Sequence, residues 1–208
     1  MKNILDKSFV KRYSQKFEYS KYPYEPYKKL VWDGVEINSK YSILGAWKTG
    51  CIKTERGKGY KSFDFEDRTY YYTRRWKDGT PAQKCAWEKL NSSNFQRKLL
   101  EVSGQNKCDK PEIFKDIKAI DGIGFVYALF VLHCENPSVF PLYDQHVYRA
   151  YLYFTNQEYK SVTVASQSWG SFERYSKWFN NQSKALGKIH PTDLDRALWK
   201  FGKELKKK

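Results

Sequence analysis

The sequence predicts a mostly α-helical protein, and three observations support this prediction. Apolar residues recur every three or four positions in most of the segments that lie between turn signals. Residues that favour helix starts precede several of these segments, and glycine or asparagine stands where some of them end. With 208 residues, the chain can bury one good core, or two small lobes that pack as a unit.

The first 38 residues form a segment without a sustained hydrophobic period. Two prolines and a glycine are scattered through it, together with several tyrosines. Proline and glycine residues placed in this way favour turns over regular structure. We therefore expect an extended, partly irregular N-terminal arm over residues 1–38 and a main body over residues 39–208.

The body begins with an expected amphipathic helix. Ser39 is placed to cap it, because serine is a favoured residue at a helix start. We expect this helix to end before the glycines of a loop at residues 57–59. Its apolar side chains have helical spacing and are Ile43, Leu44, Trp47 and Cys51.

Residues 60–80 are polar, aromatic and rich in turn residues, so we expect a loop or short strands there. One or two helices should follow between Pro81 and Val102, with Gly104 placed to end the last of them. Their apolar residues are Trp87, Leu90, Phe95, Leu99 and Leu100.

The clearest local pattern is a helix-hairpin-helix. Asp109 and Glu112 have the spacing of a capping box, with Pro111 in the first turn of the short helix that they start. The string from Ile120 to Gly124 follows, and its glycines allow positive φ angles and close approach of a partner to the backbone. The next helix is apolar on nearly every side, so it must be buried all round.

Two further helices are expected in the C-terminal third. After a break at Asn136, Asp144 opens a helix that runs to about Phe154. The last helix begins where Thr192 and Asp195 have capping-box spacing. Its core-facing residues are Leu194, Leu198, Phe201 and Leu205.

The charge of the chain indicates a polyanionic partner. Lysine and arginine number 38 against 23 aspartates and glutamates, and the net charge of +15 is spread along the chain. Such a surface attracts nucleic acid, but also anionic lipid or other acidic partners. Because no apolar run approaches the ~18 residues of a membrane span and no signal peptide is visible, we expect a soluble, cytoplasmic protein.

The four cysteines do not have the spacing of a zinc or iron–sulfur site. We expect reduced, partly buried thiols, no metal and no cofactor. The cysteines are Cys51, Cys85, Cys108 and Cys134.

The hairpin and the helix after Asp144 together resemble a known family. Gly122 and Gly124 stand in the hairpin, and Asp144, 144 − 124 = 20 residues after Gly124, begins a string that continues with His146 and Arg149. This pair of motifs resembles the HhH-GPD family of DNA glycosylases, in which an L-P-G-h-G hairpin precedes h-D-x-H-h-x-R at this spacing.

The resemblance implies a two-lobed helical fold, with the helix-hairpin-helix over about residues 110–134 and a catalytic loop and helix over residues 137–154. It also implies that the protein excises a base from double-stranded DNA, as a monomer and without a cofactor. Asp144 would then be catalytic. The residues implied to bind DNA are Gly122, Ile123, Gly124, His146 and Arg149.

The chemistry of base excision independently calls for such a carboxylate. Cleavage of an N-glycosidic bond develops positive charge on the sugar, which a nearby carboxylate stabilises while it orients the attacking water. A carboxylate at the start of Asp144's helix would be held on a rigid element. Asp144 can also act as a plain helix cap, which is compatible with catalysis, and Arg149 can instead form a structural ion pair.

One of three departures from the family pattern bears on the reaction. Family members with lyase activity carry a lysine two residues after the last hairpin glycine, and this position is Val126 here. We therefore expect a monofunctional enzyme that releases the base with water. The hairpin proline is replaced by Asp121, and the cysteines that bind an iron–sulfur cluster in some relatives are absent.

Two alternatives remain open at this point. The chain could be a DNA-binding module without catalysis, or a glycosylase with lyase activity that uses a lysine elsewhere, for instance Lys115 or Lys118. The sequence does not identify the excised base either, because the pocket that selects it is formed by residues far apart in the chain. A damaged base would indicate repair, and a modified base of viral DNA would indicate defence.

Overall fold

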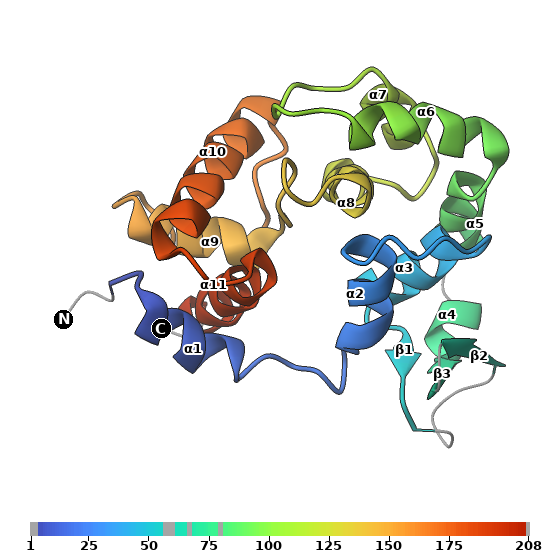
Figure 1. Ribbon diagram of the computed structural model, residues 1–208, viewed down its shortest axis with the longest axis horizontal. Coiled ribbons are helices and arrows are strands. Elements are labelled where there is room, and N and C mark those ends of the chain that lie inside the picture. Colours follow the sequence, from blue (N-terminus) through green and yellow to red (C-terminus); the bar gives the residue numbers. More distant parts are fainter. Residues whose placement is uncertain (1–3, 56–60, 66–67, 79–80, 207–208) are drawn as a thin grey trace. The chain divides into compact units, whose positions relative to one another are not determined.

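The computed structural model describes residues 4–55, 61–65, 68–78 and 81–206. In these ranges the protein has eleven α-helices and a three-stranded sheet, so the prediction of a mostly α-helical fold is confirmed (Figure 1). The glycine loop expected at residues 57–59 lies outside the described residues. The chain divides into two compact units, and each is assembled from separate segments. Unit 1 comprises residues 1–17, 105–110 and 137–208, and unit 2 comprises residues 18–104 and 111–136.

The N-terminal segment contains two helices joined by irregular chain, so our expectation of an extended arm over residues 1–38 was wrong, whereas its partly irregular character was correct. It contains α1 (Lys7–Ser14) and α2 (Tyr24–Val31). The Asp6 carboxylate caps α1 by accepting the backbone N–H of Phe9 at 2.7 Å. One apolar face of each helix is buried, and α1 belongs to unit 1 whereas α2 belongs to unit 2.

Unit 2 is built around α8 (Phe125–Glu135), the second helix of the predicted hairpin. Eight of its residues are buried, as expected for a helix that is apolar on nearly every side. Helices α2, α6 and α7 contact α8, while α3 packs on α2 and α5. The remaining helices of this unit are α3 (Lys40–Lys48), α4 (Arg74–Asp78), α5 (Pro81–Leu90), α6 (Ser93–Ser103) and α7 (Ile113–Lys118).

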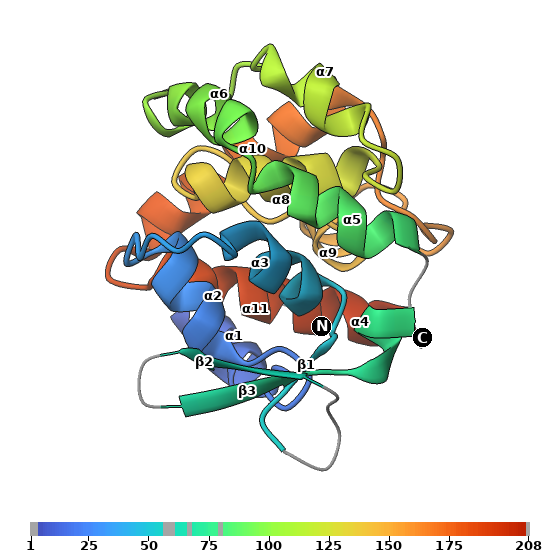
Figure 2. The same cartoon turned by 90° about the vertical axis from the view of Figure 1, so that its right-hand side faces the viewer.

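The sheet of unit 2 contains short strands, one of the two possibilities expected for residues 60–80. Strands β2 (Lys61–Phe65) and β3 (Arg68–Tyr72) are antiparallel neighbours (Figure 2). Strand β1 (Ile52–Lys53) pairs with the other edge of β3, which gives the order β1-β3-β2. Ile52 stands opposite Tyr72, and both side chains are buried.

Unit 1 consists of α1 and three longer helices, α9 (Gln145–Phe154), α10 (Trp169–Leu186) and α11 (Pro191–Leu205). The bounds of α9 agree with the prediction. Sequence reasoning missed α10, whose 18 residues make it the longest helix in the described part of the chain. Its buried residues nevertheless have helical spacing and are Phe172, Tyr175, Ser176, Phe179 and Leu186.

Several predicted helix starts are shifted. Glu112 occupies the N-cap position of α7 with a helical backbone and no side-chain capping bond, so the Asp109–Glu112 capping box does not form. His190, not Thr192, caps α11, because its Nδ1 accepts the Thr192 N–H at 3.3 Å. The expected end of α6 was correct, since Gly104 follows this helix directly.

The start of the third helix was predicted correctly, but its end was not. Ser39 is the N-cap residue of α3, although its hydroxyl makes no capping bond. The helix ends at Lys48, so Cys51 lies beyond it. Our expectation of a helix that includes Cys51 was therefore wrong, and Gly50, with a φ of 68°, marks the turn that separates them.

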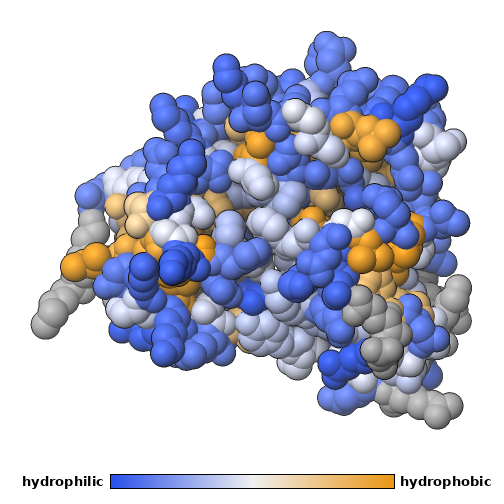
Figure 3. All heavy atoms as spheres, in the orientation of Figure 1, coloured by the Kyte–Doolittle hydropathy of each residue, from blue (hydrophilic) through white to orange (hydrophobic). Residues whose placement is uncertain are grey.

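The surface seen in Figure 3 is mostly hydrophilic, and its hydrophobic residues appear in separate patches. Within the described ranges, no helix combines the length and the apolar character that crossing a membrane requires. The cysteines are free thiols, as expected; Cys51 and Cys134 are buried, Cys108 is half-buried and Cys85 is exposed.

Candidate functional site

The predicted hairpin between α7 and α8 is a tight turn. The N–H of Ile123 donates to the carbonyl of Ile120 at 2.9 Å, and Gly122 between them has a φ of 87°. Glycine is favoured at this third position of the turn because a side chain there would be strained. Ile123 is buried and anchors the turn, while Gly122 and Gly124 are exposed.

Gly124 is the N-cap residue of α8, and no side chain caps this helix start. A Cβ atom on Gly124 would meet no atom within 4 Å, so the backbone is open to close approach there. The first N–H groups of a helix and its dipole together favour an anion. The turn therefore offers what binding of a phosphate through the backbone requires.

Asp144 is the N-cap residue of α9, as predicted. Its Oδ1 accepts the backbone N–H groups of His146 at 2.7 Å and Val147 at 3.2 Å. The Asp144 side chain is half-buried. Two bonds to one oxygen hold the carboxylate in a fixed direction at the start of the helix.

The loop before Asp144 is fastened by α10, the helix that sequence reasoning missed. The hydroxyl of Tyr175 donates to the carbonyl of Leu142 at 2.9 Å. The hydroxyl of Ser176 donates to the carbonyl of Val139, also at 2.9 Å. Both donors are buried. These bonds fix the path of the chain into Asp144, so α10 determines where the carboxylate lies.

A second carboxylate, on Asp195 of α11, lies in the same region of unit 1 and was predicted only as a capping residue. Its side chain is buried. Burial raises the pKa of Tyr175 well above its usual range, and the charges of Asp195 and Asp144 raise it further. The phenol therefore stays protonated and remains a donor to the loop.

Arg149 is fully buried, with 0% of its surface exposed. Its guanidinium donates from Nη1 to the carbonyl of Gly202 at 2.8 Å and from Nη2 to the carbonyl of Val162. The predicted contact with DNA does not fit this position, because the side chain runs inward from the buried face of α9. Arg149 instead joins three segments of unit 1.

Arg149 also determines which ring nitrogen of His146 carries the proton. Its Nη1 lies 3.3 Å from Nδ1 of His146, and a guanidinium can only donate, so Nδ1 is the acceptor. The proton of the neutral ring is then on Nε2. Burial lowers the pKa of His146, and the charges of Arg149, Lys203 and Lys206 lower it further against the opposing effect of Asp144. At pH 7 His146 is therefore a neutral Nε2–H donor.

Helix α11 lies close against the backbone of α9 at Gly202. A Cβ atom on this residue would lie 1.9 Å from the carbonyl oxygen of His146 and 2.8 Å from its carbonyl carbon. Because both atoms belong to the backbone, only glycine fits without moving a helix. The contact also sets the Trp199 ring of α11 against His146, with ring centroids 5.2 Å apart at 78°.

We expect Gly202→Ala to destabilise unit 1 by about 1–3 kcal/mol, since the added methyl group forces α9 and α11 apart. Denaturant unfolding followed by circular dichroism measures this loss. Gly170→Ala is the matched control, because a Cβ atom there meets its nearest atom at 3.7 Å. Equal stability of the two variants would contradict the close approach.

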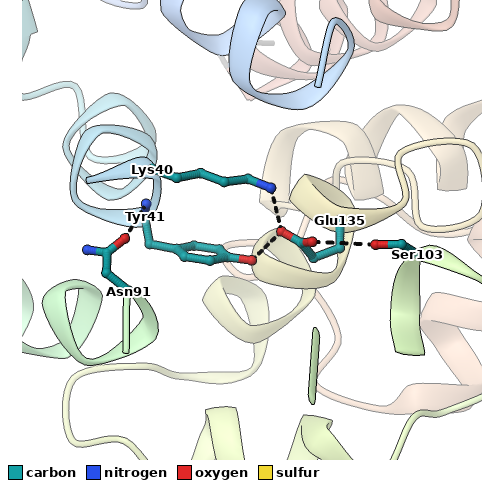
Figure 4. Close-up of polar contacts among 5 residues, drawn as sticks. All are labelled: Lys40, Tyr41, Asn91, Ser103 and Glu135. Carbon is teal, nitrogen blue, oxygen red and sulfur yellow. Dashed lines mark hydrogen bonds and ion pairs between the residues drawn. The ribbon is translucent and has the colours of Figure 1, made fainter. Parts of the chain in front are cut away.

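A separate polar cluster lies in unit 2, at the C-terminal end of α8 (Figure 4). We call it the Glu135 cluster. Glu135 accepts bonds from Lys40 Nζ at 2.7 Å and from the hydroxyl of Tyr41, and Ser103 lies 3.5 Å from its other oxygen. The Lys40 and Glu135 side chains are each only 10% exposed. Together with residues of α6, this cluster borders a cavity of 280 Å³.

The structure thus groups the predicted residues in two places. Asp144, His146 and Arg149 lie together in unit 1, whereas the hairpin residues 122–124 lie in unit 2. In the described ranges, no group of three or more His, Cys, Asp or Glu side chains is arranged to hold a metal ion. Protein-family models, curated proteins and solved structures give no match to this chain.

Proposed function

We propose that this protein is a monofunctional DNA glycosylase of the HhH-GPD type, which excises a damaged or modified base from double-stranded DNA as a monomer. One observation carries the proposal. Asp144, the aspartate of the predicted h-D-x-H-h-x-R motif, is held rigidly at the start of α9. In the sequence it follows a glycine turn that suits phosphate binding. A fixed carboxylate is what stabilises a cationic sugar in a transition state.

In the proposed reaction, the bond between C1′ of the deoxyribose and the base nitrogen breaks, and its electron pair leaves with the base. The carboxylate of Asp144 stabilises the positive charge that develops on the sugar and accepts a proton from the attacking water. The water oxygen then bonds to C1′, and the proton that Asp144 accepted passes through solvent to the departing base, which regenerates the carboxylate. The products are the free base and an intact strand with an abasic site.

DNA binding is assigned to the hairpin and to the general charge of the protein. The backbone N–H groups at the start of α8 would hold a phosphate of one strand, with Gly122 and Gly124 leaving room for it. His146 would donate its Nε2–H to another phosphate. The net charge of +15 supports binding along the backbone, because each neutralised phosphate releases counterions.

Mass spectrometry of the bases released from a panel of duplexes tests the proposal. The panel contains alkylated, oxidised and deaminated bases together with the modified bases of viral DNA. We expect one class of base to be released, and its identity distinguishes repair from defence. The strand should stay unbroken until alkali is added, and borohydride should trap no adduct, because Val126 offers no amine.

Other results of the same experiment would point to the alternatives. Tight DNA binding without release of any base would indicate a non-catalytic binding module. Strand breakage by the untreated enzyme, together with a borohydride adduct, would indicate a lyase that uses another lysine. Lys115 and Lys118 are the first to replace in that case, since both are exposed in or at the end of α7.

A further inference from the structure

Helix α11 brings an aromatic ring and a cation to the first turn of α9. Trp199 packs edge-on against His146, and Nζ of Lys203 lies 4.7 Å from the centroid of the Trp199 ring. The absence of a side chain at Gly202 permits this arrangement, because it lets the backbone of α11 lie against the backbone of α9 at His146. None of these α11 side chains was predicted to take part in function.

The charged groups around His146 leave this corner positive. From α9 and its cap, the charges of Arg149 and Asp144 act on His146. The charges of Lys203 in α11 and of Lys206, the residue after α11, act on it as well. The carboxylate of Asp144 is already bonded to two backbone N–H groups, and Arg149 is buried among carbonyl groups. Lys203 and Lys206 add two positive charges beside His146; Lys203 is half-buried and Lys206 is exposed.

Three kinds of group that suit a nucleic-acid strand thus meet at one place. The neutral His146 donates from Nε2, Lys203 offers a cation for a charge-assisted bond to phosphate, and the half-exposed Trp199 offers a ring on which a sugar or base can rest. A lysine over a tryptophan is also common on ordinary protein surfaces. This pair differs because Trp199 contacts His146, which lies two residues after the predicted catalytic Asp144.

We propose that Trp199 and Lys203 of α11 form, together with His146, a binding site for one backbone phosphate and the adjoining nucleotide of the DNA strand beside Asp144. This proposal rests on the proposed function, which supplies DNA as the ligand. It adds α11 to the DNA-binding surface and gives Trp199 a role in holding the strand next to the reacting sugar.

Binding of the full-length protein to a duplex that carries a tetrahydrofuran abasic-site analogue tests the site. Lys203→Gln should weaken binding about tenfold and reduce the slope of log Kd against log salt by about 0.9, as expected for the loss of one phosphate contact. Lys177→Gln is the matched control, because Lys177 is an exposed lysine of α10 and the charge change is the same. It should leave the slope nearly unchanged.

Three further variants test the other two members of the site, Trp199 and His146. Trp199→Ala should weaken binding about tenfold through the lost stacking surface, with little effect on the salt slope. His146→Gln places an N–H donor near the position of Nε2, so it should bind DNA better than His146→Asn, whose amide reaches only the position of Nδ1. Circular dichroism of each variant checks that the fold is retained.

The results separate this proposal from the proposed function. Equal salt slopes for Lys203→Gln and Lys177→Gln would overturn the α11 site even if the protein releases bases. A reduced slope for Lys203→Gln without release of any base would support the site and contradict the glycosylase function. Tighter binding by His146→Asn than by His146→Gln would overturn the assigned donor.

Discussion

Replacing Asp144 with Asn is expected to slow base excision about a thousandfold, which corresponds to about 4 kcal/mol of transition-state stabilisation. The amide has nearly the shape of the carboxylate but carries no charge to oppose the positive charge on the sugar. Its oxygen can still accept the N–H groups of His146 and Val147, because asparagine is as good an N-cap residue as aspartate. Single-turnover excision from the substrate identified in the panel measures the effect.

A matched variant separates catalysis from capping. Asp144→Ala removes the charge and the cap together, so it should lose the same activity and also about 1 kcal/mol of stability. Asp144→Asn should keep both its stability and its affinity for DNA. Excision by Asp144→Asn at nearly the normal rate would remove Asp144 from the reaction and leave it only its observed role as a helix cap.

The second large effect is expected in the Glu135 cluster. Glu135→Gln should destabilise unit 2 by about 3–5 kcal/mol, because it leaves the buried ammonium group of Lys40 without its counter-charge. For a chain of this size the loss corresponds to a decrease of about 6–20 °C in the unfolding midpoint. Calorimetry or urea unfolding measures it.

Two controls show whether the buried charge is the cause. Lys98 and Asp116 form an ion pair of the same 2.7 Å length, but their side chains are 45% and 47% exposed. Asp116→Asn should therefore cost less than about 1 kcal/mol. Adding Lys40→Met to Glu135→Gln should recover part of the loss, since it removes the unpaired charge. Similar losses from Glu135→Gln and Asp116→Asn would contradict the buried character of the pair.

The features predicted best were those with strong local signals. The start of α9 was correct because aspartate before an apolar period is a helix-capping signal that Asp144 fulfils with its own side chain. The burial of α8 was correct because a helix without a polar face has no stable exposed orientation. The Gly122 turn was equally local, since its positive φ needs only the glycine.

Features that depend on distant residues were not predictable. The partners Lys40 and Glu135 are separated by 135 − 40 = 95 residues, and no spacing rule connects them. The inward path of Arg149 depends on a carbonyl of α11, whereas the motif left open whether Arg149 contacts DNA or forms a structural ion pair. The missed helix α10 has a serine at its N-cap position and periodic buried residues, but Gly170, a poor helix former, stands in its first turn.

The pairing of α1 with α11 has a consequence for how the protein is made. The ring of Phe9 in α1 packs on Phe201 in α11, with centroids 5.2 Å apart. At about 5–20 residues per second, a ribosome releases α1 many seconds before α11 exists. Both segments of unit 2 are synthesised in that interval. Helix α1 is thus synthesised well before α11, so the part of its apolar face that packs on α11 is covered only after α11 has been made.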